Sequence, residues 1–310
     1  MLQRDRIIHA LKSGGELWEP APGHIGLRGD ALVRLRAIEA RLTALCAAET
    51  SDDWRVPAAL PLETLERAGY FASFPHWLTM ASHLTDDDRV LERIASSAMP
   101  ARDAAAAGAT AAAALPPAVC YHVYAALSGS VVRSPRLVTA QGCCWRHEGD
   151  RHAALERGWA FTMREVICIG SESDCVRFRD RGIAATLALA AELQLAGEMA
   201  AAEDPFFAPT SRGRALFQRI KGLKQELRLA IGDGDTVAAA SFNLHEQFFS
   251  EAFDIRLDDG SPAFSACIAF GLERWLLASL VTGATDDVEA AGDIVINAPN
   301  VIPSRREVRA

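Results

Sequence analysis

Charged and aromatic residues recur at strand-like spacing on either side of a polar loop. Arg146 and Glu148 precede the loop, and Arg157, Phe161 and Glu165 follow it. Two antiparallel strands joined by a loop place residues two or four apart on one face, so each set would face the same site. A guanidinium binds phosphate through paired hydrogen bonds, and an aromatic ring stacks on a nucleobase. The pattern indicates a nucleotide site, although a solvated hairpin pairing Arg146 with Glu148 would contain the same residues.

A second segment, from Ala269 to Arg274, reads as a strand that passes through a glycine into a helix. The first turn of that helix carries Glu273 and Arg274. Free N–H groups at a helix N-terminus favour an anion such as a phosphate. Taken alone, the tetrapeptide that begins at Gly271 is typical of many helix starts. Its place downstream of the first pattern strengthens the nucleotide interpretation.

Together the two segments resemble motif 2 and the end of motif 3 of class II aminoacyl-tRNA synthetases. The resemblance implies that the chain binds ATP and magnesium, on a mainly antiparallel sheet flanked by helices, a fold of the α+β class. Arg146 and Arg274 would be the catalytic residues. By resemblance, Arg146 stabilises charge on the α-phosphate, and Arg157 and Arg274 bind the outer phosphates. Glu148 would orient ATP, and Phe161 would stack on its adenine.

Three residues with metal-binding side chains fall on three expected strands. Cys120 lies in a strand expected at 119–125, Glu165 ends the first pattern, and Cys267 replaces a glycine that motif 3 usually has. Two thiolates, one carboxylate and an open fourth position suit a catalytic zinc ion. Spacing alone also fits ordinary core cysteines, because no Cys-x-x-Cys pair is present.

The resemblance favours zinc, because atypical archaeal seryl-tRNA synthetases and the bacterial amino acid:carrier-protein ligases related to them use Cys, Glu and Cys as zinc ligands. The carrier-protein ligases are the more similar, over roughly residues 60–300. They imply that zinc binds the amino group of a small amino acid, which ATP activates as an adenylate. The aminoacyl group then passes to the phosphopantetheine thiol of a carrier protein. A homodimer is also implied.

Two further features concern the substrate and the strand before motif 3. Ala269 replaces another usual glycine and adds a methyl group near the pocket floor, which favours glycine or alanine as the amino acid. Asn243 is a candidate contact to ATP or to the metal side of the site. An ordinary polar residue at a strand end is an equally good interpretation of Asn243.

Periodicity and composition predict the elements that would position these residues. Segments rich in Val, Ile, Phe, Thr and Cys predict strands at 119–125, 134–145, 159–170, 236–243 and 262–270. Apolar spacing, together with a capping box that begins at Ser171, predicts helices at about 30–48, 172–201 and 212–230, and a further helix after Gly271. We expect a helical extension at 1–58 and a catalytic domain at 59–310 with a helical insertion at about 172–230.

Six basic residues cluster in the helix expected at 212–230: Arg212, Arg214, Arg219, Lys221, Lys224 and Arg228. The chain as a whole has a net charge of −8, so this stripe stands out from its surroundings. It would suit an acidic carrier protein or the phosphate of its prosthetic arm. A solvated helix face is the other interpretation.

Length and composition exclude several classes of protein. Among the 310 residues no apolar run is long enough to span a membrane, and the N-terminus has no apolar signal, which predicts a cytoplasmic protein. The seven scattered cysteines are not a disulfide framework. Fewer than 60 residues precede the first match to the synthetase core, which predicts that a tRNA-binding domain and a tRNA partner are absent. A seryl-type synthetase and a catalytically silent paralogue remain the alternatives.

Overall fold

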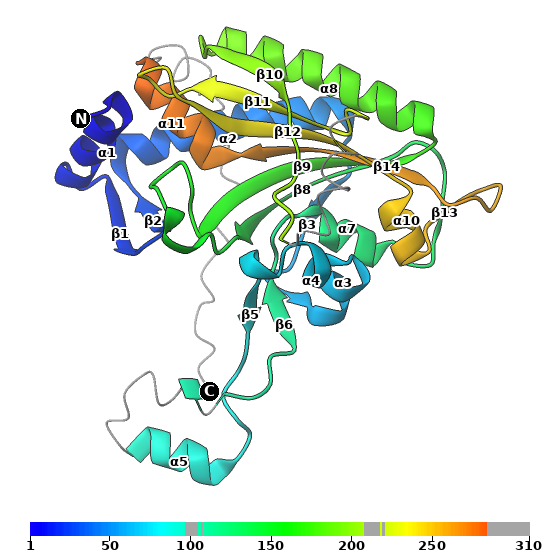
Figure 1. Cartoon of the computed structure of the whole chain (residues 1–310), viewed down its shortest axis with the longest axis horizontal. Coiled ribbons are helices and arrows are strands. Elements are labelled where there is room, and N and C mark those ends of the chain that lie inside the picture. The colour runs from blue at the N-terminus through cyan, green and yellow to red at the C-terminus, as the bar shows by residue number, and fades with distance from the viewer. Residues whose placement is uncertain (97–104, 107, 208–217, 219–220, 284–310) are drawn as a thin grey trace, which may run out of the picture.

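Seven strands form the central sheet of the computed structural model, which describes residues 1–96, 105–106, 108–207, 218 and 221–283 (Figure 1). The strand order is β10-β11-β12-β14-β9-β8-β3, and only β3 and β8 pair in parallel. The strands are β3 (Asp53–Arg55), β8 (Arg136–Trp145), β9 (Ala160–Gly170), β10 (Gly197–Ala201), β11 (Lys224–Ala230), β12 (Thr236–Glu246) and β14 (Phe264–Gly271). The predicted α+β class with a mainly antiparallel sheet is confirmed.

Three long helices cover one face of this sheet: α2 (Gly29–Glu49), α8 (Glu172–Glu192) and α11 (Leu272–Thr282). The hydroxyl of Ser171 accepts a hydrogen bond of 3.1 Å from the backbone N–H of Asp174, as the capping box predicts. A Cβ on Gly182 would lie 2.0 Å from the end of the Ile268 side chain, so a larger residue there would force Ile268 to shift where α8 packs on β14. The largest apolar core therefore lies between these helices and the sheet.

Short helices cover part of the opposite face and leave space beside them. They are α3 (Leu62–Arg67), α4 (Tyr70–Ser73), the 3-10 helix η1 (Pro75–Trp77), α7 (Cys120–Ala126) and α10 (Phe248–Phe253). A second core cluster joins α7 and α10 to β9 and β14, with Tyr124, Ile167 and Phe253 fully buried. This thinner layer helps to position the candidate site residues that are described below.

The remaining elements lie at the edges of the two layers. They are α1 (Gln3–Ser13), β1 (Leu17–Ala21), β2 (His24–Leu27), β4 (Leu60–Pro61), β5 (Thr79–Ala81), α5 (Asp88–Ser96), β6 (Ala113–Leu115), β7 (Val131–Val132), η2 (Gly149–Arg151) and β13 (Arg256–Leu257). Strands β1 and β2 form a hairpin, β4, β6 and β5 form a small sheet, and α5 lies beyond that sheet, away from the central one (Figure 1). Within the expected extension at 1–58, α2 joins the helical layer and β3 joins the central sheet.

Three predictions about secondary structure are wrong. The strand expected at 119–125 is helix α7, because its Val and Tyr side chains pack into the second core as a helix, and tertiary packing outweighs strand propensity. The helix expected at 172–201 ends at Glu192, and β10 follows. Residues 224–230, expected to be helical, are strand β11, in which Leu227 and Leu229 are buried at alternate positions. The described part of the insertion is therefore not helical throughout.

No helix among the described residues is long and apolar enough to cross a membrane.

Candidate active site

A cavity of about 700 Å³ lies between strands β9, β12 and β14 and the short helices α4 and α7. Eight of the residues that the sequence predicts for ATP or metal binding line it: Cys120, Arg146, Glu148, Phe161, Glu165, Asn243, Cys267 and Arg274. The ninth, Arg157, forms an ion pair with Glu148 at its edge. The structure therefore brings together segments that are far apart in the sequence.

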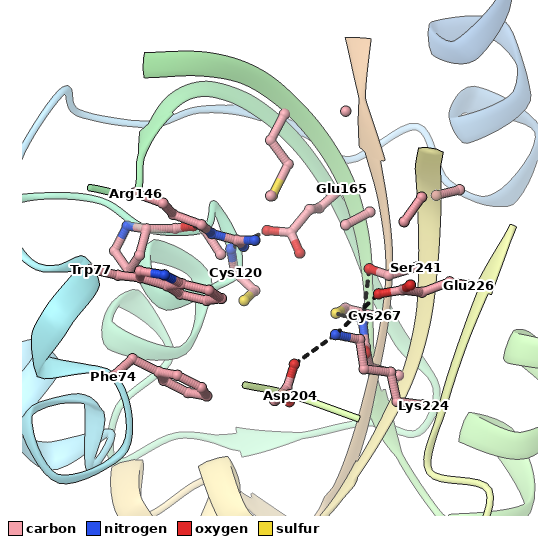
Figure 2. A pocket seen from close by; sticks show the side chains of 18 of the residues that line it. Phe74, Trp77, Cys120, Arg146, Glu165, Asp204, Lys224, Glu226, Ser241 and Cys267 are labelled. Atoms are coloured by element: carbon pink, nitrogen blue, oxygen red, sulfur yellow. Dashed lines mark hydrogen bonds and ion pairs between the residues drawn. The ribbon is translucent and has the colours of Figure 1, made fainter. Parts of the chain in front are cut away.

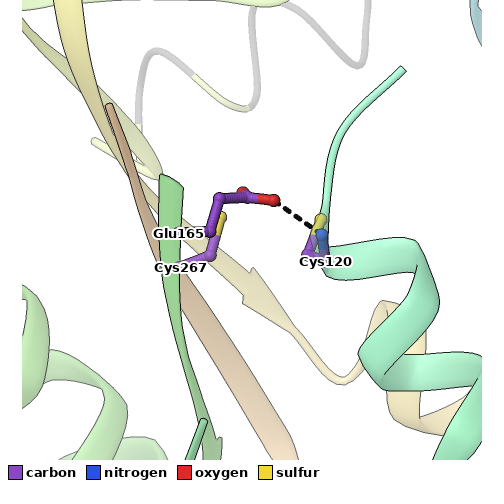
Figure 3. Close-up of side chains that lie close together, drawn as sticks. All are labelled: Cys120, Glu165 and Cys267. Carbon is purple, nitrogen blue, oxygen red and sulfur yellow. Dashed lines mark hydrogen bonds between the residues drawn. The ribbon is translucent and has the colours of Figure 1, made fainter. Parts of the chain in front are cut away.

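Cys120, Glu165 and Cys267 form a buried cluster in this cavity (Figure 3). One ligand atom from each lies within 4.8 Å of the other two, and the three residues are 5%, 1% and 3% exposed. Glu165 and Cys267 lie on the neighbouring strands β9 and β14, where the register pairs Glu165 with Ala269. Because Cys267 is two residues from Ala269, both side chains face the same side of the sheet.

The third member, Cys120, reaches the cluster from a helix and not from the expected strand. It is the first residue of α7, and its backbone N–H donates a hydrogen bond of 2.6 Å to the Glu165 carboxylate. The first N–H groups of a helix have no partner within the helix, so the carboxylate also caps α7. This contact fixes the distance between the two ligand-bearing elements.

The chemistry of this cluster fits a zinc ion. Two thiols and a carboxylate are zinc ligands, and three protein ligands leave a place for substrate. Burial, followed by the neighbouring Cys267, raises the pKa of Glu165, and a hydrogen bond with Cys267 followed by burial raises the pKa of Cys120. Among the described residues no lysine or arginine forms an ion pair with Glu165, and no basic side chain other than His245 contacts the two sulfurs. A bound cation would favour the deprotonated thiolates and carboxylate, because it would compensate the negative charge that they then carry.

Two polar residues of β12 contact the sulfur of Cys267. The side-chain amide of Asn243 donates to it at 3.4 Å, and Nε2 of His245 lies 3.3 Å from it. Asn243 therefore lies on the metal side of the site. Sequence reasoning gave His245 no role, although a residue two positions from Asn243 on a strand would share its face.

Three arginines lie in or beside the same cavity: Arg146 and Arg274 line it, and Arg157 is at its edge. The partly buried guanidinium of Arg146 donates from Nε to a backbone carbonyl at 3.0 Å and lies 5.3 Å and 5.4 Å from the ring centres of Trp77 and Phe161. Arg274 donates to two backbone carbonyls at 2.7 Å and 2.8 Å. Burial, followed by the charges of Arg146 and Arg157, lowers the pKa of Arg274. Such a concentration of positive charge favours a polyanionic ligand.

A charged group that the sequence analysis did not place in the site lies across the cavity from Phe74 and Trp77 (Figure 2). Nζ of Lys224 is 2.7 Å from Asp204 and 3.3 Å from Glu226, and the Lys224 side chain is only 12% exposed. Burial alone would raise the pKa of Asp204, but Lys224 lowers it. Lys224 and Glu226 are two residues apart, so on a strand their side chains face the same side. The helical interpretation of this segment did not predict that shared face.

The predicted carrier-protein surface is therefore wrong in part. Lys224 belongs to the cavity wall, and Arg228 bonds to Thr236 on the neighbouring strand. Lys221 is exposed and pairs with Glu246 at 2.7 Å. The other three members, Arg212, Arg214 and Arg219, lie outside the described residues.

Comparison with known proteins gives a consistent result. No family model matches the chain. Amino acid–acyl-carrier-protein ligases 1 and 2 of Bradyrhizobium diazoefficiens are 32% and 30% identical, over 91% of this chain and 84% and 82% of theirs. The type-2 serine–tRNA ligase of Methanopyrus kandleri is 28% identical over 54% of this chain but only 34% of its own length.

Solved structures that share the fold include two synthetases. M. kandleri SerRS, in complex with A. aeolicus tRNASec, superposes with a TM-score of 0.81 at 20% identity, and this chain covers 62% of it. Giardia lamblia prolyl-tRNA synthetase in complex with prolyl-adenylate gives a TM-score of 0.67 at 13% identity, with 52% of its length covered. These likenesses confirm the predicted class II synthetase-like fold.

Proposed function

Because the chain belongs to the amino acid–acyl-carrier-protein ligase family, we propose that it activates a small amino acid with ATP and transfers it to the phosphopantetheine thiol of a carrier protein. In the first step a carboxylate oxygen attacks the α-phosphorus, and pyrophosphate leaves. In the second, the thiolate attacks the acyl carbon of the adenylate, and AMP leaves. The observation that carries the proposal is one cavity lined by a buried Cys, Glu and Cys cluster and by Arg146 and Arg274, with Arg157 at its edge.

The amino group of the substrate would bind at the cluster. We propose that Cys120, Glu165 and Cys267 hold zinc, which would supply an open coordination position for that amino group. Asn243 contacts the thiol of Cys267, so we assign it to positioning this ligand and not to ATP. Hydrogen bonds from neighbouring residues orient metal ligands and tune their basicity.

The nucleotide would lie toward the arginines. Arg146 would stabilise the negative charge that develops on the α-phosphate, and Arg274 and Arg157 would bind the outer phosphates together with magnesium. Glu148 pairs with Arg157 and so would set the direction of its guanidinium. Phe161 would stack on the adenine.

The substrate side chain would be small. Ala269 lies opposite Glu165 in the sheet register, so its methyl group occupies the cavity floor beside the cluster. Tyr121 and Phe249 also line this end. Glycine and alanine fit such a site best, and a hydrophobic pocket discriminates between them by only about 10- to 200-fold.

The test is a panel of amino acids in ATP–pyrophosphate exchange, followed by transfer of labelled glycine. Acceptors offered in parallel are a carrier protein with its phosphopantetheine arm, the same carrier without the arm, and bulk tRNA. The proposal expects exchange with glycine or alanine and labelling of the first acceptor alone. Labelling of tRNA without labelling of the carrier would restore the seryl-type alternative, and no exchange with any amino acid would favour a silent paralogue.

A further inference from the structure

Tyr70 carries a buried hydroxyl that the roles assigned above do not use. It begins α4, directly after Gly69, whose left-handed backbone (φ 63°) turns the chain into this helix. The residue is 3% exposed, yet it lines the cavity. Its hydroxyl has no hydrogen-bond partner within the described part of the chain. Buried hydroxyls are nearly always bonded, so an unpartnered one beside a cavity indicates a partner supplied by the ligand.

The ring of Tyr70 is held in place from two sides. Its centroid lies 5.3 Å from that of Phe74 and 5.8 Å from that of Tyr121, the latter in an edge-to-face arrangement. Burial raises the pKa of Tyr70, so the hydroxyl keeps its proton and can donate a hydrogen bond. A fixed ring with a protonated hydroxyl is a preorganised donor.

The surroundings of this hydroxyl identify what it would bind. Of the charged or ionisable side chains that act on its pKa, Arg146 has the strongest effect, ahead of Cys144 and Asp204. The indole N–H of Trp77 is a second buried donor without a partner within the described residues, and its ring lies 5.3 Å from the Arg146 guanidinium. The segment from Tyr70 to Trp77 thus places two unused donors around one arginine. Donors gathered around a cation serve a ligand oxygen that carries negative charge.

We propose that the Tyr70 hydroxyl donates a hydrogen bond to the reacting group that Arg146 binds, the amino-acid carboxylate joined to the α-phosphate. This inference rests on the proposed function. Tyr70 would stabilise charge on that group as the bond to pyrophosphate breaks, and would hold the mixed anhydride afterwards. No proton is transferred from Tyr70 in either step.

Tyr70→Phe removes the hydroxyl and keeps the ring. We expect kcat for ATP–pyrophosphate exchange to fall about 10- to 100-fold, the value of a hydrogen bond to a charged group, while KM for ATP changes little. Because the lost hydroxyl has no protein partner, the melting temperature should stay the same or rise. Tyr124→Phe is the matched control, since Tyr124 is buried nearby but is not among the cavity-lining residues, and it should retain exchange.

A second measurement does not depend on turnover. Binding of glycyl-sulfamoyl-adenosine, an uncleavable mimic of glycyl-adenylate, should weaken about 10-fold or more in Tyr70→Phe and remain unchanged in Tyr124→Phe. Equal exchange and equal binding by Tyr70→Phe would overturn the inference. Normal exchange with slow transfer to the carrier would assign the hydroxyl to the prosthetic arm and would also overturn the inference. Reduced exchange together with a lower melting temperature of Tyr70→Phe would overturn it as well. A wild-type chain without exchange would instead overturn the proposed function itself.

Discussion

The two cysteines of the candidate metal site can be replaced together, and the chain supplies a matched control. Cys120→Ala with Cys267→Ala removes two of the three ligands. We expect the wild-type chain, purified without chelator, to hold about one zinc ion, and the double variant to hold almost none. Cys168→Ala with Cys175→Ala is the control. These two cysteines are also buried, with sulfurs 4.0 Å apart, but they do not belong to the metal-binding cluster found among the described residues.

The size of the stabilisation by zinc follows from the fact that the folded chain already holds the three ligands close together. All three ligand atoms lie within 4.8 Å of one another, whereas the unfolded chain offers only separated thiols and carboxylates. Binding to the folded state alone stabilises by RT ln(1 + [L]/Kd), about 4 kcal/mol at 1,000 times Kd. Loss of a residue that hydrogen-bonds to a metal ligand lowers metal affinity about 10- to 100-fold. Loss of two direct ligands should lower the affinity for zinc by more than that. The control loses buried thiol packing only, of the order of 1 kcal/mol per residue.

Metal analysis by mass spectrometry and thermal melting with and without a chelator measure these effects. Chelation should lower the melting temperature of the wild type and of the control by several degrees, and that of the site variant very little. Equal zinc in the site variant and the control would refute the reasoning. So would loss of zinc from both, because any pair of buried thiols would then produce the effect.

The remaining predictions concern ATP, the amino acid and the carrier. Arg274→Ala should lower exchange about 100-fold or more, and it should also lower the melting temperature, because two partly buried backbone carbonyls lose their donor. Normal exchange by this variant would show that the motif match misleads. Ala269→Val should reduce exchange with alanine more than with glycine, and a preference of the wild type for large amino acids would contradict the pocket argument. Arg214→Glu with Arg219→Glu should slow transfer to the carrier and leave exchange nearly unchanged; slower exchange would place these residues in the adenylation site.

The sequence predicts which residues meet in the site more accurately than it predicts the helices and strands that carry them. Glu165 and Phe161 are four apart on one strand, and Gly271 marks the passage into α11, so local spacing determines where those side chains lie. The strand expected at Cys120 was wrong because a partner outside the segment stabilises α7. That partner is the carboxylate of Glu165, 45 positions away, which caps the helix. No local pattern contains such a contact.

The misassigned residues 224–230 show a second limit. A cluster of basic residues at helical spacing is a surface pattern only if the segment is a helix. Lys224 instead begins a strand with neighbours on both edges, and its charge is paired with Asp204 and Glu226 inside the cavity. Strand pairing is a long-range interaction, so the composition of the segment does not reveal it. For the same reason Lys224→Glu would disturb the cavity and is unsuited to testing a docking surface.

The register of β9 determines which of its side chains face the cavity. The contacts that hold this register lie on the opposite face of the sheet. Glu165 faces the cavity, and the adjacent Arg164, 7% exposed, donates on the other face to Gln141, Thr139 and Asp53 at 3.1, 3.2 and 3.3 Å. A slip of one residue would exchange these two side chains, placing a guanidinium among the thiols and a carboxylate against the helices. A buried arginine deprived of its partners is costly, so its bonds hold Glu165 on the cavity side. Asp53 belongs to β3, the parallel edge strand. That strand therefore supports the site without contacting it.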